Sequence, residues 1–142
     1  MDLKNLYRQV IMDHYKNPRH KGLKGYKQVH LRNPSCGDDI YVEADIHDGV
    51  IKEVFHDGSG CSICCSSASV MSEVLTGKDV KTANRIINDY YQMIKGEPIA
   101  DEDLLEEALV YQGVSQFPAR IKCATIAWKA MEELLGESKN EQ

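Results

Sequence analysis

A glycine-rich turn that leads into cysteines and very small side chains constrains this chain more than any other segment. The segment contains Gly58, Gly60, Cys61, Cys64, Cys65, Ser66, Ser67, Ala68 and Ser69. Glycines allow a positive φ and a close approach of the backbone to a ligand, and small residues suit a helix packed tightly against another layer. We therefore expect the sulfur of Cys61 to take part in chemistry.

The length and charge of the chain limit its class. Its 142 residues suit one domain, which we expect over residues 1–136, followed by a frayed tail over residues 137–142. No apolar run approaches the roughly 18 residues of a membrane span, and the first residues do not resemble a signal peptide. We expect a cytoplasmic protein with no membrane partner. The net charge of −5 also argues against nucleic acid as a partner.

Two charged blocks stand out from the rest of the chain. Residues 16–32 contain six basic residues and no acid, and residues 97–107 contain six acidic residues and no base. Such blocks either steer a protein partner or form a solvated surface, and both interpretations remain open.

The first half of the chain shows a helical pattern and then an alternating one. Apolar residues recur at helical spacing over residues 3–14, and Asn17-Pro18 ends that helix. Residues 40–47 alternate between apolar and polar side chains, and Asp48-Gly49 is a hairpin turn signal. We expect strands over residues 26–31, 40–47 and 50–56.

The second half has helical periodicity throughout. Helices are expected over residues 61–76, 79–96, 101–110 and 118–136, with Asp79 as an N-cap and Pro118 in a first turn. Strands followed by helices indicate an α+β domain, here a small three-stranded antiparallel sheet with helices packed on one face.

The cysteines are the candidate metal ligands. In a reducing compartment, an odd number of cysteines favours metal binding, redox chemistry or burial over disulfides. Cys36 and Asp38 flank a glycine just before the second strand, and Cys61 follows the third. The hairpin places both segments at the same end of the sheet. Cys123 lies in the last helix and is either a further ligand or a small buried residue; three sulfurs and one carboxylate would suit tetrahedral zinc.

Three cysteine motifs, in order, resemble those of a known family. Residues 33–38, 58–63 and 112–125 closely resemble the SufU branch of the IscU/NifU-type iron–sulfur cluster assembly proteins, and residues 6–19 resemble that family's first helix. The resemblance implies a SufE/NifU-like α+β domain in which Cys36, Asp38, Cys61 and Cys123 converge on one metal site.

Departures from the scaffold-type IscU pattern favour the SufU branch. IscU scaffolds carry a Leu-Pro-Pro-Val-Lys segment and a histidine before the last cysteine, whereas this chain has Phe117-Pro118-Ala119-Arg120 and Lys122. It also carries extra residues over about 97–112, of the kind SufU proteins insert. The resemblance implies a zinc-dependent sulfur acceptor that takes persulfide sulfur from a cysteine desulfurase, a sulfurtransferase-like carrier rather than an enzyme that turns over a small molecule.

Roles within that site follow as expectations. Cys36 is the predicted sulfur acceptor, because its glycine-flanked turn can move, and Arg120 either supports a thiolate or partner carboxylate or is a surface arginine. Cys64 and Cys65 are either buried small residues or spare thiols.

Two alternative functions remain open. One is a scaffold that builds an iron–sulfur cluster on Cys36, Cys61 and Cys123 and hands it to apo-proteins or cluster carriers. The other is a binding module with purely structural zinc.

Overall fold

The structure, a computed structural model, describes residues 3–140 and the side chains of residues 3–137. In chain order the elements are α1 (Leu3–Lys16), β1 (Lys27–Asn33), β2 (Asp38–His47), β3 (Val50–Ser59), α2 (Ser62–Leu75), α3 (Val80–Ile94), η1 (Glu102–Gln116) and α4 (Pro118–Asn140). The predicted α+β class, with strands before most of the helices, is confirmed.

The sheet is antiparallel, with the strand order β1-β2-β3. Asn33 pairs with Asp38 across the first turn, and Asp39 pairs with Ser59 across the second pair of strands. The β1–β2 turn and the residues after β3 therefore lie at the same end of the sheet, as predicted from the hairpin.

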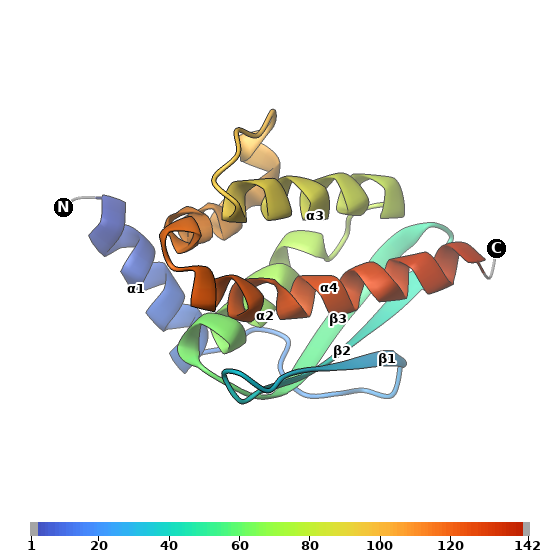
Figure 1. The fold of residues 1–142 in the computed structure, drawn as a ribbon. Coiled ribbons are helices and arrows are strands. Elements are labelled where there is room, and N and C mark those ends of the chain that lie inside the picture. Colours follow the sequence, from blue (N-terminus) through green and yellow to red (C-terminus); the bar gives the residue numbers. More distant parts are fainter. Residues whose placement is uncertain (1–2, 141–142) are drawn as a thin grey trace.

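The helices cover one face of this sheet (Figure 1). Packing places α4 over β1 and β2, and α2 over β3, while α3 packs on α4 and η1 and lies farther from the strands. Ile40, Val42 and Ala44 are buried in the core, as the predicted alternation requires. The alternation is wrong at Glu43, which is buried because its carboxylate accepts hydrogen bonds from backbone N–H groups such as that of Gly25. A register shift at Asp45 leaves Ile46 half-buried. Within the described residues, no helix combines the length and the apolar character needed to cross a membrane.

The small residues of α2 allow it to lie in the centre of the helical layer. Ser66, Ser67, Ala68 and Ser69 are all fully buried. The Ser67 hydroxyl donates to the Ala124 carbonyl at 2.8 Å and accepts from the Trp128 indole N–H at 2.9 Å. Serine hydroxyls thus join α2 to α4 at a distance that larger side chains would not permit.

Two helix predictions differ from the structure. The segment predicted as a helix over residues 101–110 is a 3-10 helix over Glu102–Gln116, interrupted at Glu106, whose φ of 50° breaks the helical path. The last helix continues past Gly136 to Asn140, because Gly136 does not adopt the positive φ of a helix-ending glycine. Residues 137–140 of the predicted tail are therefore helical, and residues 141–142 lie outside the described residues.

Candidate metal centre

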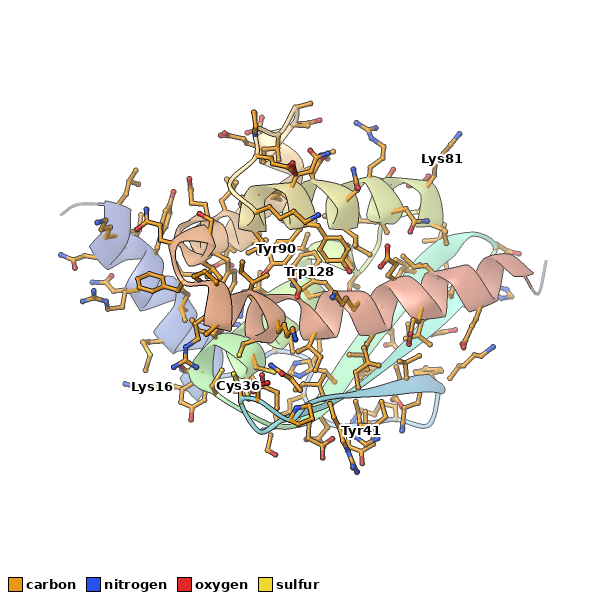
Figure 2. All side chains as sticks on the ribbon, viewed as in Figure 1. Lys16, Cys36, Tyr41, Lys81, Tyr90 and Trp128 are labelled. Atoms are coloured by element: carbon orange, nitrogen blue, oxygen red, sulfur yellow. The ribbon has the colours of Figure 1, made fainter. Side chains whose placement is uncertain are left out.

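The β1–β2 turn holds Cys36 at the end of the sheet. Its backbone N–H donates to the Asn33 carbonyl at 3.2 Å, and the next residue, Gly37, has a φ of 70°, which favours glycine. The Cys36 side chain is half-buried, and its Sγ lies 3.8 Å from the carbonyl oxygen of Ala119. Figure 2 shows Cys36 near the first turn of α2. This thiol is held by a short turn and remains accessible.

Asp38 is the first residue of β2, and its carboxylate is buried with both oxygens hydrogen-bonded. One oxygen accepts from the Cys61 backbone N–H at 3.1 Å, and the other accepts from the Asn33 side-chain amide at 3.2 Å. The carboxylate fits because Gly60 has no side chain: a Cβ there would lie 2.6 Å from Asp38 Oδ1. The glycine-rich turn therefore makes room for the carboxylate beside Cys61.

Cys123 approaches this turn from the first turns of α4. The Sγ atoms of Cys36 and Cys123 and a carboxylate oxygen of Asp38 all lie within 4.8 Å of one another. Cys61 is the N-cap of α2 and is half-buried, and its backbone N–H donates to the Asp38 carboxylate at 3.1 Å. The four residues named in the sequence prediction are thus neighbours, with Cys61 outside the tight three-residue group.

The environment of Cys123 favours the protonated thiol when no metal is present. Burial, and then hydrogen bonding to the Cys36, Asp38 and Cys61 side chains, raises the pKa of Cys123 far above that of a free thiol. Arg120 lies one turn earlier on α4 and is exposed. A hydrogen bond with Cys123, and then the charges of Cys61 and Cys123, raise the pKa of Arg120. The exposed guanidinium is therefore close enough to these thiols to interact with them electrostatically.

This donor set fits zinc. Thiolates and a carboxylate are zinc ligands, and bond lengths of about 2.0–2.3 Å separate neighbouring tetrahedral ligands by about 3.3–3.8 Å. Donor atoms that already lie within 4.8 Å of one another need little movement to reach that spacing. A cation would also offset the cost of holding the buried Asp38 carboxylate and a Cys123 thiolate side by side.

Cys64 and Cys65 differ from each other. Cys64 is fully buried in the hydrophobic core, and burial raises its pKa far above the ordinary value. Cys65 is half-buried, its Sγ lies 3.6 Å from the Gly60 carbonyl oxygen, and its pKa is also raised by burial. The interpretation as a buried small residue fits Cys64, whereas Cys65 stays near the site without joining the group of donor atoms.

Asn33 is a site residue to which the sequence analysis assigned no role. Its amide donates to Asp38 at 3.2 Å and lies 3.8 Å from Cys123 Sγ, so that it bridges two of the donors. Asn33 and Asp38 stand at the two ends of the short turn that joins the first two strands, and this position could have indicated the contact. The structure pairs the two residues across the sheet, where paired side chains share a face.

Comparison with known proteins gives matches over most of the chain. Residues 6–124 match the family described as NifU-like N terminal domain. The zinc-dependent sulfurtransferase SufU of Bacillus subtilis is 45% identical over 141 residues, which cover 99% of this chain and 95% of that protein. The iron–sulfur cluster assembly scaffold protein IscU of Streptococcus pyogenes is 37% identical over 141 residues, covering 99% and 89%.

Solved structures give the same result for the fold. A crystal structure described as that of a hypothetical protein superposes with a TM-score of 0.88 at 36% identity, covering 94% of this chain and 98% of that one. A proposed iron–sulfur cluster assembly scaffold protein for the SUF system, from Fervidobacterium islandicum, superposes with a TM-score of 0.84 at 29% identity, covering 89% and 94%. The sequence similarity and the shared fold therefore extend over nearly the whole chain.

Proposed function

We propose, on the premise that this chain belongs to the family of NifU-like N-terminal domains, that it serves iron–sulfur cluster assembly as a zinc-dependent sulfur acceptor. The sulfur donor would be the persulfide of a cysteine desulfurase in the cytoplasm, and the recipients would be apo-proteins or cluster carriers. The convergence of Cys36, Asp38 and Cys123 within 4.8 Å, with Cys61 adjacent, is the observation that carries the proposal.

Cys36, Asp38, Cys61 and Cys123 are the residues that would hold the zinc ion. Zinc supplies a positive charge that keeps its cysteine ligands as thiolates, the form that attacks sulfur. Asn33 orients the carboxylate from one side, and the Cys61 N–H orients it from the other. These two hydrogen bonds keep the carboxylate directed at the thiols.

Cys36 is the proposed acceptor, because it is partly exposed and lies on a turn outside the helices and strands. Cys123 is buried within a helix, whereas Cys36 lies on a turn next to Gly37. In the transfer step, the Cys36 thiolate attacks the outer sulfur of the partner's persulfide. A new S–S bond forms at Cys36, the partner's S–S bond breaks, and the partner's cysteine leaves as a thiolate.

Arg120 is proposed to support this step electrostatically. The interaction of its guanidinium with Cys123 and Cys61 would stabilise thiolate character during approach of the donor. An Arg120→Gln variant should bind zinc like wild type but accept sulfur more slowly.

The test is single-turnover transfer from a persulfide-loaded cysteine desulfurase to the zinc-loaded protein, read as a mass increase of one sulfur atom. Cys36→Ala should abolish the increase while the protein stays folded. Cys65→Ser is the matched control, because that thiol is also half-buried but lies outside the group of donor atoms, and it should accept sulfur like wild type. Full sulfur loading of Cys36→Ala would reject the assignment of the acceptor.

The scaffold function is the second candidate, because the same thiols suit an iron–sulfur cluster and the chain is 37% identical to a protein named as an IscU scaffold. Anaerobic addition of iron and sulfide separates the two. A colourless, zinc-loaded protein supports sulfur transfer, whereas visible absorbance that survives desalting supports a scaffold. If zinc removal only unfolds the protein and no desulfurase responds to it, the zinc is structural.

A further inference from the structure

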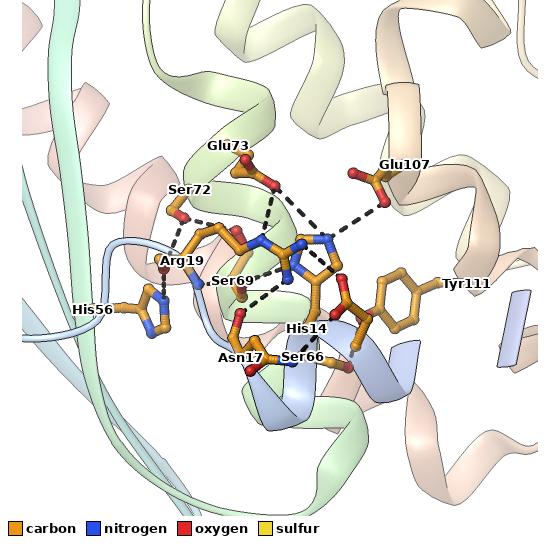
Figure 3. Close-up of polar contacts among 11 residues, drawn as sticks. His14, Asn17, Arg19, His56, Ser66, Ser69, Ser72, Glu73, Glu107 and Tyr111 are labelled. Carbon is orange, nitrogen blue, oxygen red and sulfur yellow. Dashed lines mark hydrogen bonds and ion pairs between the residues drawn. The ribbon is translucent and has the colours of Figure 1, made fainter. Parts of the chain in front are cut away.

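A second cluster of potential metal ligands lies away from the cysteines, where α1, α2 and η1 meet (Figure 3). His14 on α1 is fully buried, and its Nδ1 is hydrogen-bonded to the Ser69 hydroxyl at 2.8 Å. Its other ring nitrogen, Nε2, is buried without a hydrogen-bond partner among the described residues. This nitrogen lies 3.7 Å from a carboxylate oxygen of Glu73 and 3.4 Å from one of Glu107.

These two distances exceed those of ordinary hydrogen bonds. An N–H···O bond spans about 2.7–3.2 Å. Two ligands on one tetrahedral zinc ion, at bond lengths of about 2.0–2.2 Å, lie about 3.3–3.6 Å apart. The separations at His14 are close to this ligand spacing, and the three ligand atoms all lie within 4.8 Å of one another.

The charges around His14 leave this site short of a cation. Two carboxylates, 41% and 53% exposed, stand over one buried imidazole. Arg19 is the nearby cation, but its guanidinium bonds Asp13 at 2.6 Å and lies farther from Glu73, at 3.8 Å. A divalent ion between the imidazole and the two carboxylates would supply the missing charge.

The hydrogen bonds behind His14 suit a ligand histidine. Metal-bound histidines donate the N–H of the second ring nitrogen to a fixed acceptor, which sets the tautomer. Ser69 Oγ can serve as this acceptor in the His14 tautomer that carries the proton on Nδ1: it is buried, it lies 2.8 Å from Nδ1, and it is held in place by the Arg19 backbone N–H at 2.8 Å. With Nδ1–H donating to Ser69, the lone pair of Nε2 is directed at the two carboxylates.

An ion can reach these carboxylates from solvent. A cavity of about 150 Å³ is lined by Glu73, Glu106 and Glu107 together with Val70 and Val74. The acidic rim attracts cations, and the cavity is larger than an ion with its remaining water ligands requires.

We propose that His14, Glu73 and Glu107 form a second site, which binds a divalent transition-metal ion such as zinc or ferrous iron through imidazole and carboxylate ligands. The three ligands come from α1, α2 and η1, so the bound ion ties the N-terminal helix to the helix that begins after Cys61. The site contains no cysteine, so an experiment that rejects the sulfur-acceptor function does not reject this site, and the reverse also holds.

Zinc stoichiometry and affinity of the full chain test the proposal, with zinc itself as the probe. Wild type should bind two zinc ions, and Glu107→Gln should weaken the second by at least the roughly 10–100-fold that loss of an outer-shell partner costs. Glu102→Gln is the matched control: this glutamate also lies on η1, is exposed, and lies outside both the three-ligand group and the cavity. It should bind two zinc ions like wild type.

Two further variants separate ligation from a general effect of charge. Glu107→His removes the negative charge but restores a ligand atom, so it should recover the second zinc ion that Glu107→Gln loses. Cys36→Ser with Cys61→Ser should keep this site filled, and cadmium NMR should then show a signal from nitrogen and oxygen ligands that is separate from any signal of cadmium bound to Cys123. A single zinc ion per wild-type chain, or equal zinc binding by Glu107→Gln and Glu102→Gln, would overturn the proposal.

Discussion

An alanine at position 60 tests whether the Asp38 carboxylate is a metal ligand. The added Cβ would lie 2.6 Å from Asp38 Oδ1 and 3.2 Å from Asp38 Cα. The Cα is held by strand pairing, because Asp38 lies opposite Asn33 in the sheet. The carboxylate is therefore the group that must move away from the thiols.

Moving the Asp38 carboxylate should lower both the stability of the metal-free protein and its affinity for zinc. Overpacking a buried site costs about 1–3 kcal/mol, and a hydrogen bond to a charged group is worth about 1.5–3 kcal/mol. The Cys61 N–H to Asp38 bond, now 3.1 Å, is the one strained. Because part of each cost is relieved by side-chain rotation, we expect the metal-free protein to lose about 1–3 kcal/mol of unfolding free energy. Zinc affinity should fall about 10–100-fold, or roughly 1.4–2.7 kcal/mol.

Urea unfolding of the metal-free protein and zinc competition against a chromophoric chelator measure the two quantities separately. Gly113→Ala is the control, because a Cβ at Gly113 meets no atom within 4 Å, and its zinc affinity should equal that of wild type. Unchanged zinc affinity in Gly60→Ala, together with lowered stability, would show that the carboxylate shapes the turn without binding the metal.

Three other predictions concern stability. Ser67→Ala leaves the Trp128 indole N–H buried without its 2.9 Å acceptor and should cost about 1–3 kcal/mol in urea unfolding. The double variant with Trp128→Phe should lose less than the sum of the two single losses, and strict additivity would contradict the reasoning. Burial lowers the pKa of His56, whose Nε2 bonds the Arg19 carbonyl, so the unfolded chain takes up a proton first as pH falls below about 6.5. The unfolding free energy should then decrease below that pH in wild type and decrease less in His56→Gln. An equal dependence of the unfolding free energy on pH in both proteins would show that His56 is not the group responsible. Chelation of zinc held at 100 times its dissociation constant should lower the unfolding free energy by about 2.7 kcal/mol, seen as a shift of the urea midpoint.

Local patterns in the sequence were sufficient for the order of the elements and for part of the site. Strand alternation and the Asp48-Gly49 turn predicted a meander, and the meander places Cys36 and Cys61 at one end of the sheet. The meander and the common position of these two cysteines can both be inferred without knowing how the helices pack, because both depend only on segments that are neighbours along the chain. The same local view predicted an α-helix where η1 forms a 3-10 helix, since the break at Glu106 is a backbone conformation with no sequence signature.

Long-range contacts do not follow from local sequence patterns, and the tertiary structure decided them. The residues themselves left Cys123 as either a ligand or a buried side chain, and the family resemblance was needed to place it with Cys36 and Asp38. Asn33 and Cys123 are 90 residues apart, and His14 and Ser69 are 55 residues apart. Periodicity determines which face of an element is buried, but which buried polar atoms meet depends on how helices and strands pack. Both candidate metal sites are assembled at that level.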